Sequence, residues 1–65
     1  MQTTEQWLDE KIFEYRKDPT GTLLDMLERI NDVATQYLNS PSLATKGVLE
    51  SAIRHHELFM KKILS

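Results

Sequence analysis

The sequence predicts an all-α fold: a three-helix bundle, or a helical hairpin with a short N-terminal helix across it, a form that often dimerises. Apolar side chains recur at helical spacing along three segments of the 65 residues. Two turn-like clusters, KDPTGT (17–22) and NSPS (39–42), separate these segments. Because both turns are short, successive helices should pack nearly antiparallel. We therefore expect one helical domain over residues 1–65, with helices at about 4–17, 20–38 and 41–64.

The first segment begins with a capping signal. Thr3 and Gln6 have the spacing of a capping box, in which each side chain bonds the other residue's amide. A narrow apolar stripe follows, made of Leu8, Ile12 and Tyr15. Trp7 and Phe13 lie off this stripe, to either side of it. The sequence therefore leaves open whether these two aromatic side chains belong to the core or to an interface.

The second segment has the strongest amphipathic pattern. Asp18 is a candidate N-cap with Pro19 at the first helical position, and Thr22 with Asp25 marks a later alternative start. One continuous apolar arc contains Leu23, Leu24, Met26, Leu27, Ile30, Val33, Ala34, Tyr37 and Leu38. An arc this broad predicts a helix that packs against two neighbours.

The third segment is expected to begin at Pro41, with Ser40 as its N-cap. Its apolar face contains Val48, Leu49, Ala52, Ile53, His56, Phe59, Met60, Ile63 and Leu64. Leu58 falls instead on the charged arc of this segment, beside Arg54. Gly47 indicates either a close backbone approach or a break near the start of the helix.

Composition narrows the class of protein. A 65-residue domain buries only about 60% of its unfolded surface, so it gains from self-association, and we expect a homodimer. There is no cysteine, the net charge is −2, and no apolar run approaches the length of a membrane span. The N-terminus has no signal-peptide pattern. These observations favour a cytoplasmic protein with no membrane partner.

The adjacent His55 and His56 are the nearest approach to a chemical motif. They are separated by about 100° on a helix, so they do not share one metal, and neither has a ligand at i+3 or i+4. His56 lies within the apolar face, where we expect a hydrogen bond to a tyrosine, a backbone carbonyl or water. If His56 is buried and neutral, its protonation near pH 5–6 would oppose folding or assembly.

No arrangement of residues in the sequence indicates catalysis. The chain has no glycine-rich phosphate loop and no cysteine nucleophile, and most carboxylates fall on the solvent arcs. We also expect little room for a cavity of about 300 Å³ or more in so short a chain. The sequence therefore predicts a protein that is not an enzyme and that needs no metal or cofactor.

The expected function is that of a small regulatory or adaptor protein, of the inhibitor or modulator type that phages also encode, which binds another protein through a helical surface. Large apolar side chains that the bundle does not need are the candidates for contact. They are Trp7, Phe13, Leu24, His56 and Leu58.

The alternative is a nucleic-acid-associated regulator that acts as a helical dimer. It would use the basic side chains of the third segment, Lys46, Arg54, Lys61 and Lys62. The stretch LATKGVLESAI (43–53) resembles the turn of a helix-turn-helix, although its Ala44-to-Gly47 spacing is one residue shorter.

Two further stretches resemble small helical families. TLLDMLERI with LESAIRHHEL resembles pieces of the Rop-type RNA-binding hairpin, but residues 19–21 break the chain where that family has continuous helix. YRKDPTGTLLDML with SAIRH and ELFMKK resembles the Hha/YmoA family of nucleoid-protein modulators, whose Asp-His-Arg motif is Arg54-His55-His56 here. Because of these departures, the chain is assigned to neither family.

Overall fold

The structure is a computed structural model that describes residues 2–65. It consists of three helices packed against one another: α1 (Thr4–Lys17), α2 (Pro19–Asn39) and α3 (Leu43–Leu64). No strand occurs in these residues. The predicted all-α class with three helices is therefore confirmed.

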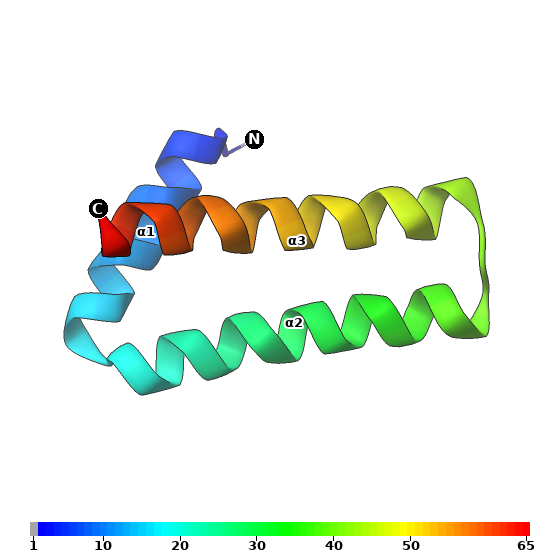
Figure 1. Cartoon of the computed structure of the whole chain (residues 1–65), viewed down its shortest axis with the longest axis horizontal. Coiled ribbons are helices and arrows are strands. Elements are labelled where there is room, and N and C mark those ends of the chain that lie inside the picture. The colour runs from blue at the N-terminus through cyan, green and yellow to red at the C-terminus, as the bar shows by residue number, and fades with distance from the viewer. Residues whose placement is uncertain (1) are drawn as a thin grey trace.

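The two long helices form an antiparallel hairpin, and α1 crosses one end of it (Figure 1). All three pairs of helices are in contact. At 1.5 Å per residue, α1 is only about 20 Å long, whereas α2 and α3 are each about 30 Å long. As a result, α1 covers the end of the hairpin near residues 18–23. The end near residues 38–44 consists of α2 and α3 alone.

The start of α1 and its joint with α2 follow the capping signals in the sequence. Thr3 and Gln6 form the predicted capping box, with the Gln6 amide donating to Thr3 Oγ1 over 3.1 Å. Asp18 alone separates α1 from α2, and it is the C-cap of the first and the N-cap of the second. Its carboxylate accepts from the Gly21 amide over 3.1 Å, with Pro19 at the first helical position, as predicted.

The expected start of the third helix at Pro41 is wrong. The helix begins at Leu43, and its N-cap is Ser42 rather than Ser40. Ser42 and Thr45 form a reciprocal capping box, in which each side chain accepts from the other residue's amide. Proline disfavours the helical conformation in the residue before it, and Ser40 has φ −145° and ψ 72°, so residues 40–42 form a connection instead of a helical turn.

The core lies where the three helices meet. Leu8 of α1, Met26 of α2 and Phe59 of α3 form its buried cluster, and Phe59 is 0% exposed. The ring of Tyr15 meets that of Phe59 edge-on, with centroids 5.8 Å apart and an interplanar angle of 77°. Edge-to-face pairs of this kind add about 0.5–1.5 kcal/mol to the energy of burial.

Two expectations about the helix faces need correction. Leu58 was placed on the charged arc, but it is half-buried and packs against the core cluster, because α1 approaches α3 from that side. The broad arc of α2 does contact both neighbours, yet Leu24, Leu27 and Leu38 on its far edge remain exposed. Two helices do not cover the whole arc.

Candidate functional site: a groove lined by both histidines

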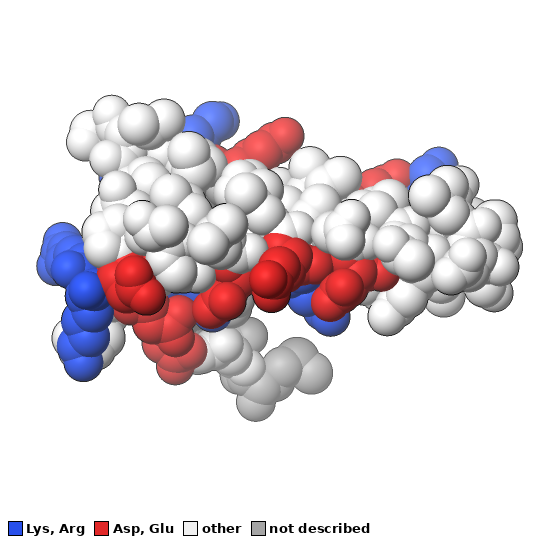
Figure 2. Space-filling view, turned by 90° about the horizontal axis from the view of Figure 1, so that it is seen from below, with Lys and Arg blue, Asp and Glu red and all other residues white. Residues whose placement is uncertain are grey.

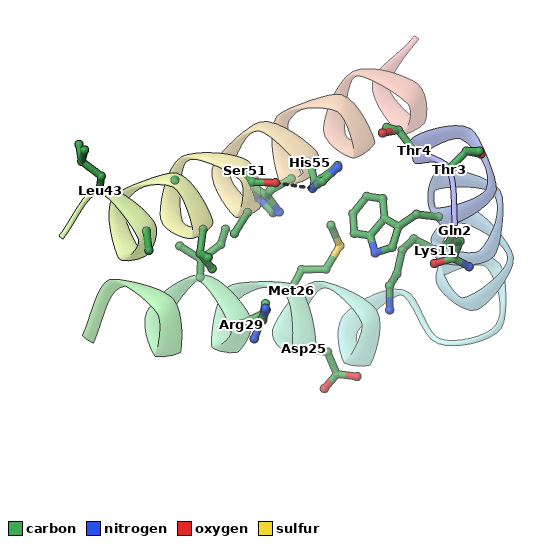
Figure 3. Close-up of a pocket in the computed structure, with 17 residues that line it drawn as sticks. Gln2, Thr3, Thr4, Lys11, Asp25, Met26, Arg29, Leu43, Ser51 and His55 are labelled. Atoms are coloured by element: carbon green, nitrogen blue, oxygen red, sulfur yellow. Dashed lines mark hydrogen bonds between the residues drawn. The ribbon is translucent and has the colours of Figure 1, made fainter. Parts of the chain in front are cut away.

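An open groove runs from α1 along the uncovered part of the hairpin (Figure 3). Its volume is about 950 Å³, so the expectation that this chain has no room for a sizeable cavity is wrong. The groove exists because α1 crosses only one end of the hairpin. Its lining comes from all three helices and the residues before α1: Gln2, Thr3, Thr4, Trp7, Lys11, Asp25, Met26, Arg29, Ile30, Leu43, Ala44, Gly47, Val48, Ser51, Ala52, His55 and His56.

Trp7 and His55 form the aromatic wall of the groove. Their ring centroids are 5.1 Å apart at an angle of 44°, and both side chains are half-buried. Trp7 also packs against the core cluster next to Leu8. The capping box at Thr3 fixes where α1 begins, and it thereby fixes the position of Trp7 one turn later. The only tryptophan of the chain is therefore both a core contact and a groove contact.

The α3 side of the groove is a row of small and apolar side chains. Ala44, Val48 and Ala52 follow one another at i, i+4 and i+8, so they lie above one another on one face. Gly47 lies beside this row, and a Cβ at that position would meet no atom within 4 Å. The row spans about three helical turns, with enough open space above it for another helix to approach closely.

His56 departs most from its expected environment. We expected a hydrogen bond to its ring, yet its buried Nδ1 has no partner, and no other buried side-chain nitrogen or oxygen of residues 2–65 is left unpaired. An unsatisfied buried polar atom costs about 1–3 kcal/mol. His56 also lines the groove, but its Nδ1 is buried, so a ligand in the groove would meet other atoms of the ring.

Ser51 and His55 lie close together, at a distance slightly longer than is usual for a nucleophile and its base. Ser51 Oγ is 3.4 Å from His55 Nδ1, one turn apart on α3 (Figure 3). A nucleophile and its base are usually within about 2.6–3.2 Å, and a third group orients the base. The neighbour of His55 across the groove is the Trp7 ring rather than a carboxylate. The contact is better explained as a side-chain pair that holds the imidazole against Trp7.

The remaining predicted contact residues do not gather in the groove. Of the five, the structure brings only Trp7 and His56 together. Phe13 is 60% exposed on α1, with the Lys17 ammonium 4.3 Å from its ring centroid. Leu24 is exposed on α2 outside the groove, and Leu58 packs against the core. His55, Val48 and Ala52 were not among the predicted contacts, although their helical spacing relative to His56 was readable from the sequence.

Lys46, Arg54 and Lys61 lie within about 80° of one another on α3, but acidic side chains interrupt this row. Lys46 pairs with Glu50 at 3.8 Å, and helical positions place Lys62 about 100° from Lys61. Glu50 and Glu57 alternate with the basic residues along the helix. The chain continues as one helix through Gly47, so the resemblance of residues 43–53 to a helix-turn-helix is not borne out.

Within residues 2–65, no group of three or more histidine or acidic side chains is placed to hold a metal ion. None of α1, α2 and α3 is both long enough and apolar enough to cross a membrane.

Comparison with known proteins gave no relative. No family model, no curated protein and no solved structure matches this chain. The proposed function therefore rests on the groove.

Proposed function

We propose that this protein is a small non-enzymatic binding module, of the inhibitor or adaptor type, that takes an apolar helical segment of another protein into its groove. The observation that carries the proposal is the open groove itself, whose walls come from three helices and include Trp7 and a row of small apolar side chains on α3. Grooves of this shape bind amphipathic helices through side chains spaced three and four residues apart.

The walls match that kind of ligand. Trp7 presents a large apolar surface, while Ala44 and Ala52 allow a helix backbone to come close. Met26, which extends from α2 toward α3, forms part of the floor between them (Figure 3). A helix with two or three aliphatic residues on one face would fill the groove. Aromatic anchors surrounded by small apolar contacts are typical of binding hot spots.

A capture experiment with matched variants tests this proposal. The tagged protein is used to isolate partners from its native cells, in parallel with Val48→Glu, which places a charge in the groove, and Phe13→Glu, which changes an exposed residue outside it. We expect Phe13→Glu to retain the partner and Val48→Glu to lose it. Capture that is unaffected by Val48→Glu would contradict the proposal.

The purified partner then allows a direct measurement. Trp7 is the only tryptophan in the chain and lies in the groove, so its fluorescence should change on binding, provided the signal of the partner is subtracted. We expect an affinity that changes little between about 50 and 200 mM salt, because the contact is mainly apolar. A steep loss of affinity over this range, with nucleic acid as the retained molecule, would favour the alternative in which Lys46, Arg54, Lys61 and Lys62 bind phosphate.

A further inference from the structure

A second apolar surface lies on the opposite side of the hairpin from the groove. Five exposed apolar side chains belong to it, and none of them lines the groove: Leu24, Leu27, Leu38, Ile53 and Leu64. On α2, Leu27 and Leu38 lie about 120° and 140° around the helix from the buried Val33, and on α3, Ile53 lies about 120° from the buried Phe59. We call this surface the open face. In Figure 2 an uncharged expanse lies on one side of the row of acidic side chains along α2.

The α2 part of the open face has the spacing of a helix-packing seam. Leu24, Leu27, Asn31, Ala34 and Leu38 occupy positions a, d, a, d and a of a heptad repeat. This spacing keeps one narrow stripe directed at a neighbouring helix over two heptads. Leu24 and Leu27 are 54% and 52% exposed, which shows that no helix of the same chain covers this stripe.

We infer that the open face packs against the open face of a second copy of this chain, so that two α2–α3 hairpins form a four-helix core. This inference does not depend on the proposed function, because the groove and its residues lie on the other side of the hairpin.

The amount of apolar surface suits a weak contact between two copies. Fully burying a leucine is worth about 1.5–3 kcal/mol at about 25 cal/mol per Å², which corresponds to about 60–120 Å², so a half-exposed side chain of the open face leaves about 30–60 Å² uncovered. Ten such side chains give about 300–600 Å², and the neighbouring Asn31, Ala34 and charged edges have to supply the rest of the roughly 1,000 Å² at the lower limit of specific interfaces. The expected result is a weak dimer, with a dissociation constant in the micromolar range.

Charge decides how the two hairpins face each other. Asp25, Glu28 and Asp32 follow the outer edge of α2, so an α2-on-α2 arrangement would bring six carboxylates together. The outer edge of α3 carries Lys46, Arg54 and Lys61 among its acidic residues. A two-fold axis parallel to the helices places α2 of each copy on α3 of the other, where these edges complement each other.

This arrangement makes a specific prediction about distance. Leu27 is twelve residues before the end of α2 and Ile53 is ten residues after the start of α3, so the two lie at nearly the same level along the hairpin. Rotation about a two-fold axis parallel to the helices does not change the position of a residue along the hairpin. Leu27 therefore lies beside Ile53 of the second copy, while the two copies of Leu27 lie diagonally across the core from each other.

Sedimentation equilibrium of the full chain over about 1–200 µM tests the dimer. Leu27→Glu should raise the dissociation constant at least 100-fold, because two leucine contacts are lost in each dimer and two charges are buried. Val48→Glu, in the groove, should leave the dissociation constant within about twofold, and circular dichroism shows whether each variant remains helical. A wild-type chain that stays monomeric at 200 µM would overturn the inference, as would a Leu27→Glu variant that dimerises like the wild type.

Cysteine crosslinking gives a second and independent measurement, since the chain has no cysteine of its own. Leu27→Cys and Ile53→Cys chains are oxidised separately and after mixing. A covalent dimer that forms only in the mixture supports α2 packed on α3 of the second copy. A dimer that forms with Leu27→Cys alone, or no covalent dimer in any sample, contradicts this arrangement.

Discussion

The two ends of the α2–α3 hairpin differ in what covers them. At the end that α1 crosses, Leu8, Met26 and Phe59 come from three helices and exclude water. At the other end only two helices meet, and the apolar side chains of Leu38 and Leu43 are 76% and 89% exposed (Figure 1). The three-helix core therefore lies at one end of the hairpin, while the other end leaves Leu38 and Leu43 uncovered.

This difference separates stability from binding. Sixty-five residues bury enough apolar surface for one small core, and the position of α1 places that core at one end. The surface left over includes both the groove and the open face. Large uncovered apolar patches on small proteins are typical of interaction sites. The short length of α1 is thus the structural cause of the groove, whereas the open face lies on the opposite side of the hairpin, which no helix of this chain covers.

The largest expected effect is the loss of Phe59. Phe59→Ala removes a fully buried ring that also contacts Tyr15, and it should lower the free energy of unfolding by about 3–5 kcal/mol, enough to unfold most molecules of a small domain. Val33→Ala, outside the three-helix cluster, should cost only about 2 kcal/mol, since it removes two methyl groups. Urea unfolding followed by circular dichroism measures both. Equal losses would mean that the core extends along the whole hairpin.

The cap of α3 gives a smaller effect at the uncovered end. Ser42→Ala removes the side chain that accepts from the Thr45 amide, and it should cost about 1 kcal/mol. Ser40→Ala is the matched control, because only the backbone carbonyl of Ser40 bonds Thr45, and its effect should stay within about 0.5 kcal/mol. The urea midpoints of the two variants provide the comparison. If Ser40→Ala were the more damaging, the structural start of α3 would be incorrect.

The smallest effect is a gain in stability. Gly47→Ala should raise the free energy of unfolding by up to about 1 kcal/mol, since the new methyl group meets no atom within 4 Å in the interior of α3. Gly21→Ala should bring no such gain, because its Cβ would overlap the Asp18 carboxylate that caps α2. Thermal unfolding of both variants at equal concentration measures the difference. A larger gain from Gly21→Ala than from Gly47→Ala would contradict the described packing.

The sequence was informative about each helix separately. The capping box at Thr3, the double signal of Asp18 and Pro19, and the apolar periodicity all depend on residues within one turn of each other, so they predicted the helices and the fold class correctly. The predicted start of α3 was wrong because Ser40 and Ser42 are both good N-cap residues. Only the reciprocal bonds between Ser42 and Thr45 distinguish them.

The groove could not be predicted, because it depends on the angle at which α1 crosses the hairpin. Periodicity placed His56 on the apolar face correctly, but it does not say which part of that face a neighbouring helix covers. The same limitation explains Leu58, whose position on the charged arc was overridden by the approach of α1. Contacts between helices, rather than patterns within them, decide which of the predicted residues can meet a partner.

The shared cap at Asp18 has a consequence for where this chain tolerates changes in length. Asp18 alone caps the end of α1 and the start of α2, so a change in the length of this connection would remove at least one of the two caps. An inserted residue there would rotate α1 relative to the hairpin, and it would move Trp7 out of the groove and Leu8 out of the core. Residues 40–42 join two helices that are already held side by side. Tags, labels and permuted termini therefore belong in that connection.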